Sequence, residues 1–138
     1  MAARALQMLN NVCVKTFIHA SQPAFARGVE VKFNGDDNLL QAAGANDPLA
    51  IGITEVANDA GSEARVALYG IGIIPVTVGT GDATRGVDAT TVASGFTNAA
   101  TNGAGTVSQI IKGKFMQSGV ANDLVGLLIG VNQRSVTA

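Results

Sequence analysis

The segment EARVALY, residues 63–69, carries the clearest structural pattern in the chain. Its apolar residues Ala64, Val66 and Leu68 fall at every second position, and Glu63, Arg65 and Tyr69 lie on the opposite face. This period of two is typical of a β-strand that buries one of its faces. The segment therefore predicts a strand, and the Asn and Gly residues just before it predict a turn that leads into it.

The same alternation extends outward from this segment. Val29, Val31 and Phe33 alternate with charged residues and run into Asn34-Gly35, a turn pair that accepts positive φ. Short strands about 8–12 residues apart, separated by Gly, Asn and Asp turns, are typical of a small sandwich or barrel. We therefore predict an all-β fold, a small antiparallel β-barrel or sandwich. Further strands are expected at 49–53, 71–78, 90–93, 106–116 and 124–131.

The N-terminal segment differs from this series of hairpins. Its apolar residues fit a helical stripe over 5–12 and a strand over 12–16, so both conformations stay open. Pro23 separates the segment from the strands that follow. We predict an N-terminal extended arm at 1–26 and a β-rich body at 27–138.

The composition limits the function classes. The chain has 138 residues, a net charge of -1, and a charged fraction of only 14%, against about 25% in an average soluble domain. No basic excess is available to neutralise phosphates, so we expect no nucleic-acid partner. The longest apolar stretch, 71–78, is far shorter than the roughly 20 residues of a membrane helix, so we expect no membrane. Scarce surface charge indicates that neighbouring molecules cover part of the surface.

Residues that could carry chemistry are few. Cys13 and His19, each the only one of its kind, would lie about 20 Å apart on a strand and off a shared face on a helix. The sequence has neither the Gly-x-Ser-x-Gly elbow of hydrolases nor a Gly-x-x-x-x-Gly-Lys phosphate loop. A lone cysteine also excludes an intrachain disulfide. We expect a protein that is not an enzyme, with no catalytic residue, cofactor or metal.

The triplet Ala-Asn-Asp occurs at 45–47, 57–59 and 121–123, each time shortly before an apolar strand. Asn and Asp favour turns because their side chains bond to nearby backbone and tolerate positive φ. We interpret the triplets as reused turn chemistry rather than as an internal repeat or a metal-binding loop.

Four short stretches of the predicted body carry a resemblance to a known family. They are RGVEVK at 27–32, LAIGIT at 49–54, ARVALYG at 64–70 and VGLLIG at 125–130. Together they resemble the capsid decoration, or cement, proteins of tailed bacteriophages. The resemblance spans 27–131 and lies in the residue composition and in the spacing of the strands, without a diagnostic motif.

The resemblance implies a viral structural protein that binds the outer surface of a phage capsid and stabilises it by bridging coat subunits. The implied partners are the major capsid protein and copies of the chain itself, as a homotrimer. The implied location is the capsid exterior of the virion, after synthesis in the host cytoplasm. Two alternatives stay open. One is another virion component (minor coat, head–tail joining or tail protein). The other is a ligand-binding β-barrel module, which a concave pocket lined by Phe17, Phe33 or Tyr69 would favour.

Two apolar segments are candidates for these contacts. The arm would bind the coat, unless it completes the protein's own barrel. A second segment would mediate self-association, unless it is buried in the core of the monomer. The candidate residues are Leu6, Leu9, Val12, Val14, Phe17 and Ile18 for the arm, and Ile71, Ile73 and Ile74 for self-association.

Overall fold

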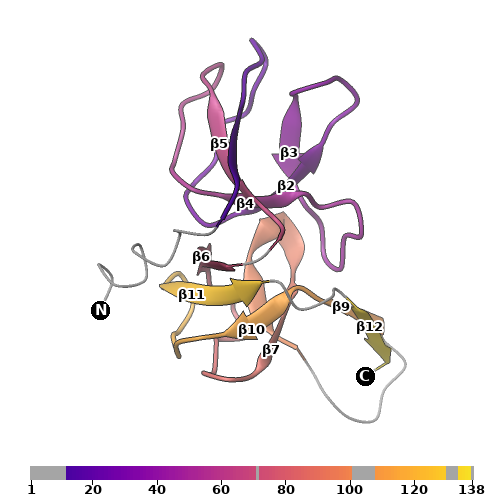
Figure 1. Cartoon of the computed structure of the whole chain (residues 1–138), viewed down its shortest axis with the longest axis vertical. Coiled ribbons are helices and arrows are strands. Elements are labelled where there is room, and N and C mark those ends of the chain that lie inside the picture. Colours follow the sequence, from indigo (N-terminus) through magenta and orange to yellow (C-terminus); the bar gives the residue numbers. More distant parts are fainter. Residues whose placement is uncertain (1–11, 71, 101–107, 130–133, 138) are drawn as a thin grey trace.

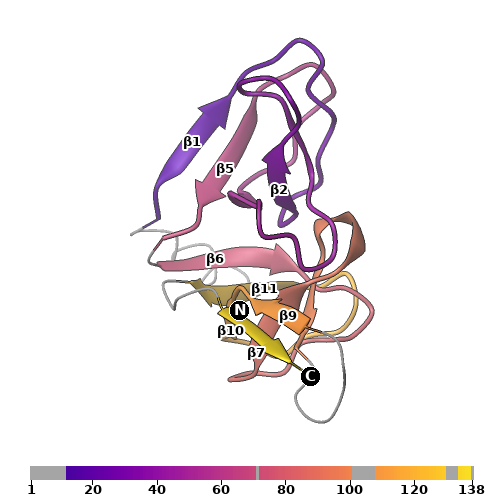
Figure 2. The same ribbon diagram turned by 90° about the vertical axis from the view of Figure 1, so that its right-hand side faces the viewer.

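The structure, a computed structural model, describes residues 12–70, 72–100, 108–129 and 134–137 (Figure 1). Its regular structure is almost entirely β-strand, all pairings between the strands are antiparallel, and the described residues include no α-helix. Two five-stranded sheets pack on each other, and neither closes into a barrel (Figure 2). The all-β antiparallel prediction is confirmed, in its sandwich-like form.

The first sheet occupies the upper half of Figure 1 and has the strand order β1-β5-β4-β2-β3. Its strands are β1 (Val14–Phe17), β2 (Glu30–Phe33), β3 (Leu40–Ala42), β4 (Gly52–Thr54) and β5 (Ala64–Leu68). The β1 strand comes from the segment predicted as an arm, and it pairs with β5 over its whole length.

The second sheet lies below the first and has the order β6-β11-β10-β7-β8. Its strands are β6 (Gly72–Thr77), β7 (Asp88–Thr91), β8 (Thr97–Ala99), β10 (Gly113–Phe115) and β11 (Leu124–Ile129), with the short 3₁₀ turn η2 (Ala93–Gly95) between β7 and β8. A separate two-stranded ribbon pairs β9 (Ser108–Ile111) with β12 (Arg134–Thr137). The strand predicted over 106–116 is divided into β9 and β10 at Lys112, and the Lys112 side chain is buried in the contact between the sheets.

The two sheets are copies of one topology. When the five strands of each sheet are counted along the chain, both sheets have the same spatial order: first, fifth, fourth, second, third. Backbone hydrogen bonds repeat as well: Gly28 N–H donates to Thr54 O, and Gly86 N–H donates to Phe115 O. We call 12–70 the first unit and 72–129 the second unit, and we call positions that match in the two sheets equivalent.

A short sequence signal accompanies the repeat. Arg-Gly-Val-Glu at 27–30 and Arg-Gly-Val-Asp at 85–88 are equivalent, and their glycines have φ of +80° and +84°. The Ala-Asn-Asp triplets do not mark the repeat. The isolated bridges place Asn58 and Gly119 at equivalent positions, so the triplets at 57–59 and 121–123 are out of register.

Each unit has a small core on the same face of its sheet, which we call the front face. The front-face residues of the first unit are buried together, and their equivalents in the second unit are buried too. The first set is Phe17, Phe25, Val31, Leu40, Ala64 and Val66, and the equivalent set is Val76, Ala83, Ala89, Thr97, Val125 and Leu127.

The back face of the first sheet packs on the second unit. Val14, Ala67, Ile53 and Glu30 pair across neighbouring strands and form a row on this back face. Ile53 and Ala67 belong to the same buried cluster as Ile74, Ile129 and their neighbours on the second sheet. Apolar burial between the units thus completes the core that the second unit alone would leave open.

Candidate functional site

The contact between the two units, which we call the junction, contains a buried ion pair. Glu30 Oε2 lies 3.2 Å from Lys112 Nζ, and both side chains are almost fully buried. Lys112 Nζ also donates to Asp47 O at 2.7 Å, and the Tyr69 hydroxyl donates to Glu30 Oε2. Each buried charge therefore has a charged partner and a further hydrogen bond, while Glu30 Oε1 has no hydrogen-bond partner among the described residues.

Burial sets the acid–base behaviour of these groups. Burial raises the pKa of Glu30, and the nearby ammonium of Lys112 and the hydrogen bond from Tyr69 oppose this rise. Burial together with the Glu30 carboxylate raises the pKa of Tyr69 well above its usual range. A phenol with such a pKa stays protonated at neutral pH, so it remains a hydrogen-bond donor to Glu30.

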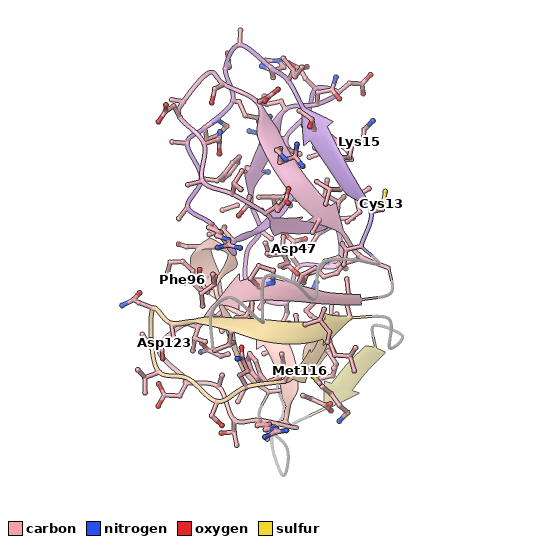
Figure 3. The ribbon with its side chains drawn as sticks, turned by 60° about the vertical axis from the view of Figure 1, so that its left-hand side comes forward. Cys13, Lys15, Asp47, Phe96, Met116 and Asp123 are labelled. Atoms are coloured by element: carbon pink, nitrogen blue, oxygen red, sulfur yellow. The ribbon has the colours of Figure 1, made fainter. Side chains whose placement is uncertain are left out.

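The loop from 44 to 49 forms the other half of the junction, between the two sheets (Figure 3). Asn46 N–H donates to Thr91 O at 3.0 Å, and the Asn46 side chain accepts from Thr90 Oγ1 at 2.9 Å. Asp47 shapes the loop: burial alone would raise its pKa, but Lys32 Nζ at 2.6 Å and the N–H groups of Leu49 and Gly44 lower it. Asp47 thus stays ionised and fixes the shape of the loop, while its backbone oxygen accepts from Lys112 of the second unit.

An apolar hollow of about 400 Å³ lies on the front face of the first unit. Its lining residues come from strands β1, β2 and β5 and from the residues beside β4 and β5. They are Lys15, Phe17, Phe33, Ile51, Leu68 and Tyr69. Phe17 and Phe33 meet edge to face with ring centroids 5.6 Å apart. Phe33 is 48% exposed, so a large aromatic surface is open to solvent here.

The hollow gathers the three aromatic residues that sequence analysis singled out for a binding pocket. Phe17, Phe33 and Tyr69 lie far apart in the sequence, and β1, β2 and β5 bring them to one end of one face. The Tyr69 hydroxyl points to Glu30 instead of into the hollow, so only the ring contributes. We call this hollow, with its six lining residues, the front patch.

The predicted arm residues fall in several places. Leu6 and Leu9 lie outside the described residues. Val12 and Val14 are half-buried against the junction, Phe17 is buried in the core of the first unit, and Ile18 is 68% exposed.

The predicted self-association residues are also divided. Ile71 lies outside the described residues, Ile74 is buried in the junction, and Ile73 is half-buried on the back face of the second sheet. Sequence reasoning did not identify Glu30 and Lys112 as a pair. No local signal marked the pair, because Glu30 falls on the charged side of the alternation at 29–33 and would be expected to face solvent.

The residues considered for chemistry are held apart. Cys13 is exposed just before β1 (Figure 3). His19 follows β1, where its Nδ1 accepts from Ser21 N–H and its Nε2 lies 3.5 Å from Asp36. Among the residues that the structure describes, no group of three or more His, Cys, Asp or Glu side chains is arranged to hold a metal ion. Within the same residues, no helix has the length and hydropathy to cross a membrane.

Comparison with solved structures gives an informative likeness in fold. No protein-family model matches the sequence, and no curated protein matches it either. Among solved structures, the fold is similar to the N base of the head fiber protein gp8.5 of bacteriophage phi29. The TM-score is 0.62 at 15% identity, over 88% of this chain and 98% of that chain. At this identity the likeness establishes a shared fold, and it covers both units.

Proposed function

We propose that this protein is a structural component of a phage virion that binds the outer surface of the head. In this proposal it bridges coat subunits as a homotrimer and has no catalytic role. The observation that carries the proposal is the fold similarity to a phage head fiber base over nearly the whole length of both chains. That base belongs to a head fiber of a phage, and the sequence resemblance implies a position on the outside of a phage head for this chain.

The surface of the protein supports this role. Large apolar side chains are exposed on both units, among them Ile18 at 68% and Val120 at 61%. Partners that cover such residues would add apolar burial worth roughly 25 cal/mol per Å² before the costs of ordering. A capsid repeats each contact at many symmetric positions, so a modest gain per copy stabilises the whole shell.

The decisive experiment locates the chain on the native particle by electron cryo-microscopy. Density for this chain at many symmetric positions on the outside of the head would support the proposal. A single ring at one vertex would indicate a head–tail joining protein instead, and density in the tail would indicate a tail protein.

A second candidate function is a ligand-binding module, and the front patch favours it. A hollow of about 400 Å³ falls in the range of about 300–1,000 Å³ that small-molecule sites occupy. Its lining offers three aromatic rings but only one charged group, Lys15. Binding of carbohydrate or another small ligand that Phe33→Ser abolishes would support this candidate.

A further inference from the structure

The turn between β2 and β3 contains an exposed Asn-Gly pair, Asn34 and Gly35. Asn34 directly follows Phe33, the last residue of β2, so the pair lies beside the front patch. Gly35 has a φ of +80°, a conformation that glycine adopts without the steric cost that other residues meet. The backbone of the turn thus accounts for Gly35, but it does not account for the amide side chain of Asn34.

The backbone of Asn34 is held in place, whereas its side chain is not. Asn34 N–H donates to Leu39 O, and Asn34 O accepts from Asp36 N–H, both at 2.9 Å. No described residue forms a hydrogen bond with the side-chain amide of Asn34. Asn58 is the contrast, because its side chain forms three hydrogen bonds with the backbone. The amide of Asn34 can therefore rotate toward the main chain that follows it.

The nitrogen of Gly35 is also accessible. Within the part of the chain that the structure describes, no group accepts from Gly35 N–H. A Cβ built at Gly35 would meet no atom within 4 Å beyond its chain neighbours, so the space around this nitrogen is open. Asn34 Cγ and Gly35 N are the two atoms that react when an asparagine deamidates, and no hydrogen bond between described residues keeps them apart.

We propose that Asn34 is a modification site at which the folded protein deamidates spontaneously. In this reaction Gly35 N attacks Asn34 Cγ and a C–N bond forms. The side-chain nitrogen leaves as ammonia and takes the proton of Gly35 N with it. Water then opens the resulting succinimide ring at one of its two carbonyl carbons. One opening gives aspartate, and the other gives isoaspartate, in which the main chain runs through the former side-chain carbon.

Both products change the surface next to the front patch. The new carboxylate is ionised at neutral pH, as exposed aspartates are, and it adds a negative charge to a chain whose net charge is -1. Asp36 and Asp37 lie in the same turn, so like charges gather beside an apolar hollow. Isoaspartate also lengthens the main chain between β2 and β3, two strands whose register pairs Phe33 with Leu40. Deamidation therefore alters the surroundings of Phe33.

The test incubates the purified full chain in neutral buffer and follows the conversion of Asn34 by tryptic digestion and mass spectrometry. Trypsin releases 33–65 as one peptide, because Lys32 and Arg65 are consecutive cleavage sites. The other Asn-Gly pair of the sequence, at 102–103, falls in a different peptide. Conversion at one pair therefore cannot be mistaken for conversion at the other.

Asn38 provides a control within the same turn and the same peptide. It is also exposed, but Leu39 follows it, and Leu39 N–H donates to Asp36 O at 3.3 Å. A bulky side chain and a bonded N–H both hinder attack on the Asn38 amide. A parallel sample in concentrated urea gives the rate of conversion of Asn34 in the unfolded chain, and circular dichroism confirms that the sample without urea stays folded.

We expect Asn34 to convert in the folded protein at a rate similar to that in urea, while Asn38 remains an amide. Isoaspartate in 33–65 should be detected by methylation with an isoaspartyl methyltransferase. The variant Asn34→Gln should lose the conversion in this peptide, because the longer side chain would have to close a larger and more slowly formed ring.

Three results would overturn the proposal. The first is an Asn34 that stays an amide in the folded protein although it converts in urea, which would show that the turn protects it. The second is equal conversion of Asn34 and Asn38, and the third is aspartate without isoaspartate, which would indicate direct hydrolysis by water. The proposed function is tested separately, because none of these results depends on whether the protein binds phage heads.

Discussion

Glu30 and Lys112 illustrate how a single long-range pair can define the junction. The two residues belong to different units, yet they are among the largest fully buried side chains of the protein. A buried ion pair adds little net stability over apolar residues of the same shape, but loss of one partner leaves an uncompensated charge. The pair therefore favours the arrangement of the units in which both charges are satisfied.

We predict that Lys112→Met destabilises the protein in a pH-dependent manner. Burial already raises the pKa of Glu30, and loss of the ammonium will raise this pKa further. An acid with a raised folded pKa contributes its full stability below the unfolded pKa, here near the ordinary 4.5, and this contribution is lost as pH rises through the folded pKa. The loss should be about 3–5 kcal/mol at neutral pH and much smaller below the unfolded pKa. Urea unfolding across this pH range measures it.

Two controls accompany this prediction. Lys114→Met removes a half-exposed partner of Asp88 and should change the free energy of unfolding by only about 0–1 kcal/mol. The double variant Glu30→Gln with Lys112→Met removes both charges of the buried pair, so it should recover most of the neutral-pH loss. A flat pH response of K112M would contradict the account given for Glu30.

At the scale of elements, both units contain the same close contact between two neighbouring strands. Gly52 in β4 and Gly113 in β10 are equivalent, and each lies directly beside the backbone of the neighbouring strand. A Cβ at Gly52 would come within 2.2 Å of Ala67 O, and a Cβ at Gly113 would come within 2.3 Å of Leu128 O. Both strands thus require glycine for the same reason, which is the approach of β5 or β11.

We predict that Gly52→Ala and Gly113→Ala each destabilise the protein by about 1–3 kcal/mol or more, because the added methyl group must displace the paired strand. Gly44→Ala is the control, since its Cβ would meet only Asp47 Oδ2 at 4.0 Å. It should stay within about 0.5 kcal/mol of wild type. Thermal unfolding followed by circular dichroism measures all three. Similar melting temperatures for G52A and wild type would contradict the close strand approach.

At the scale of the whole molecule, the two units depend on each other. Ile53 and Ala67 on the back face of the first unit are buried against the second unit, and they complete the core of the second unit. Thr77 N–H also donates to Gly28 O across the junction at 2.9 Å. Units that share a core should unfold together, as small single domains do.

This dependence can be measured through Tyr69, the only tyrosine in a chain that has no tryptophan. Its ring lies 5.7 Å from Lys112 Nζ in the junction, so its fluorescence reports on the separation of the units. We predict that urea unfolding followed by Tyr69 fluorescence coincides with unfolding followed by circular dichroism. An earlier fluorescence transition would show that the units separate before they unfold.

Attachment to the head can be tested at the same scale. Deletion of 2–11 removes the first part of the predicted arm and leaves β1 intact, which deletion through residue 19 would not. If the arm contacts the coat, this deletion and Ile18→Ser should lower occupancy on heads, measured by quantitative gel analysis of purified particles. Val120→Ser has a similar exposure and serves as the control variant. Unchanged occupancy in both arm variants would contradict a role of the arm in binding.

The sequence by itself determined the class of the fold. Alternation at 29–33 and 63–69, with Gly and Asn turns between strands, is a local property that requires no knowledge of distant partners, and it predicted antiparallel strands correctly. The aromatic residues of the front patch were also visible in the sequence as candidates for one pocket.

Only the tertiary structure decided how the strands divide into two equivalent units and which surfaces these units share. The two units share strand order and register, but their sequences are alike mainly at 27–30 and 85–88. The Glu30–Lys112 pair spans more than half the chain, and no local pattern couples two such positions. Burial selects these contacts, because a charge or an apolar face finds its partner only once the sheets are packed.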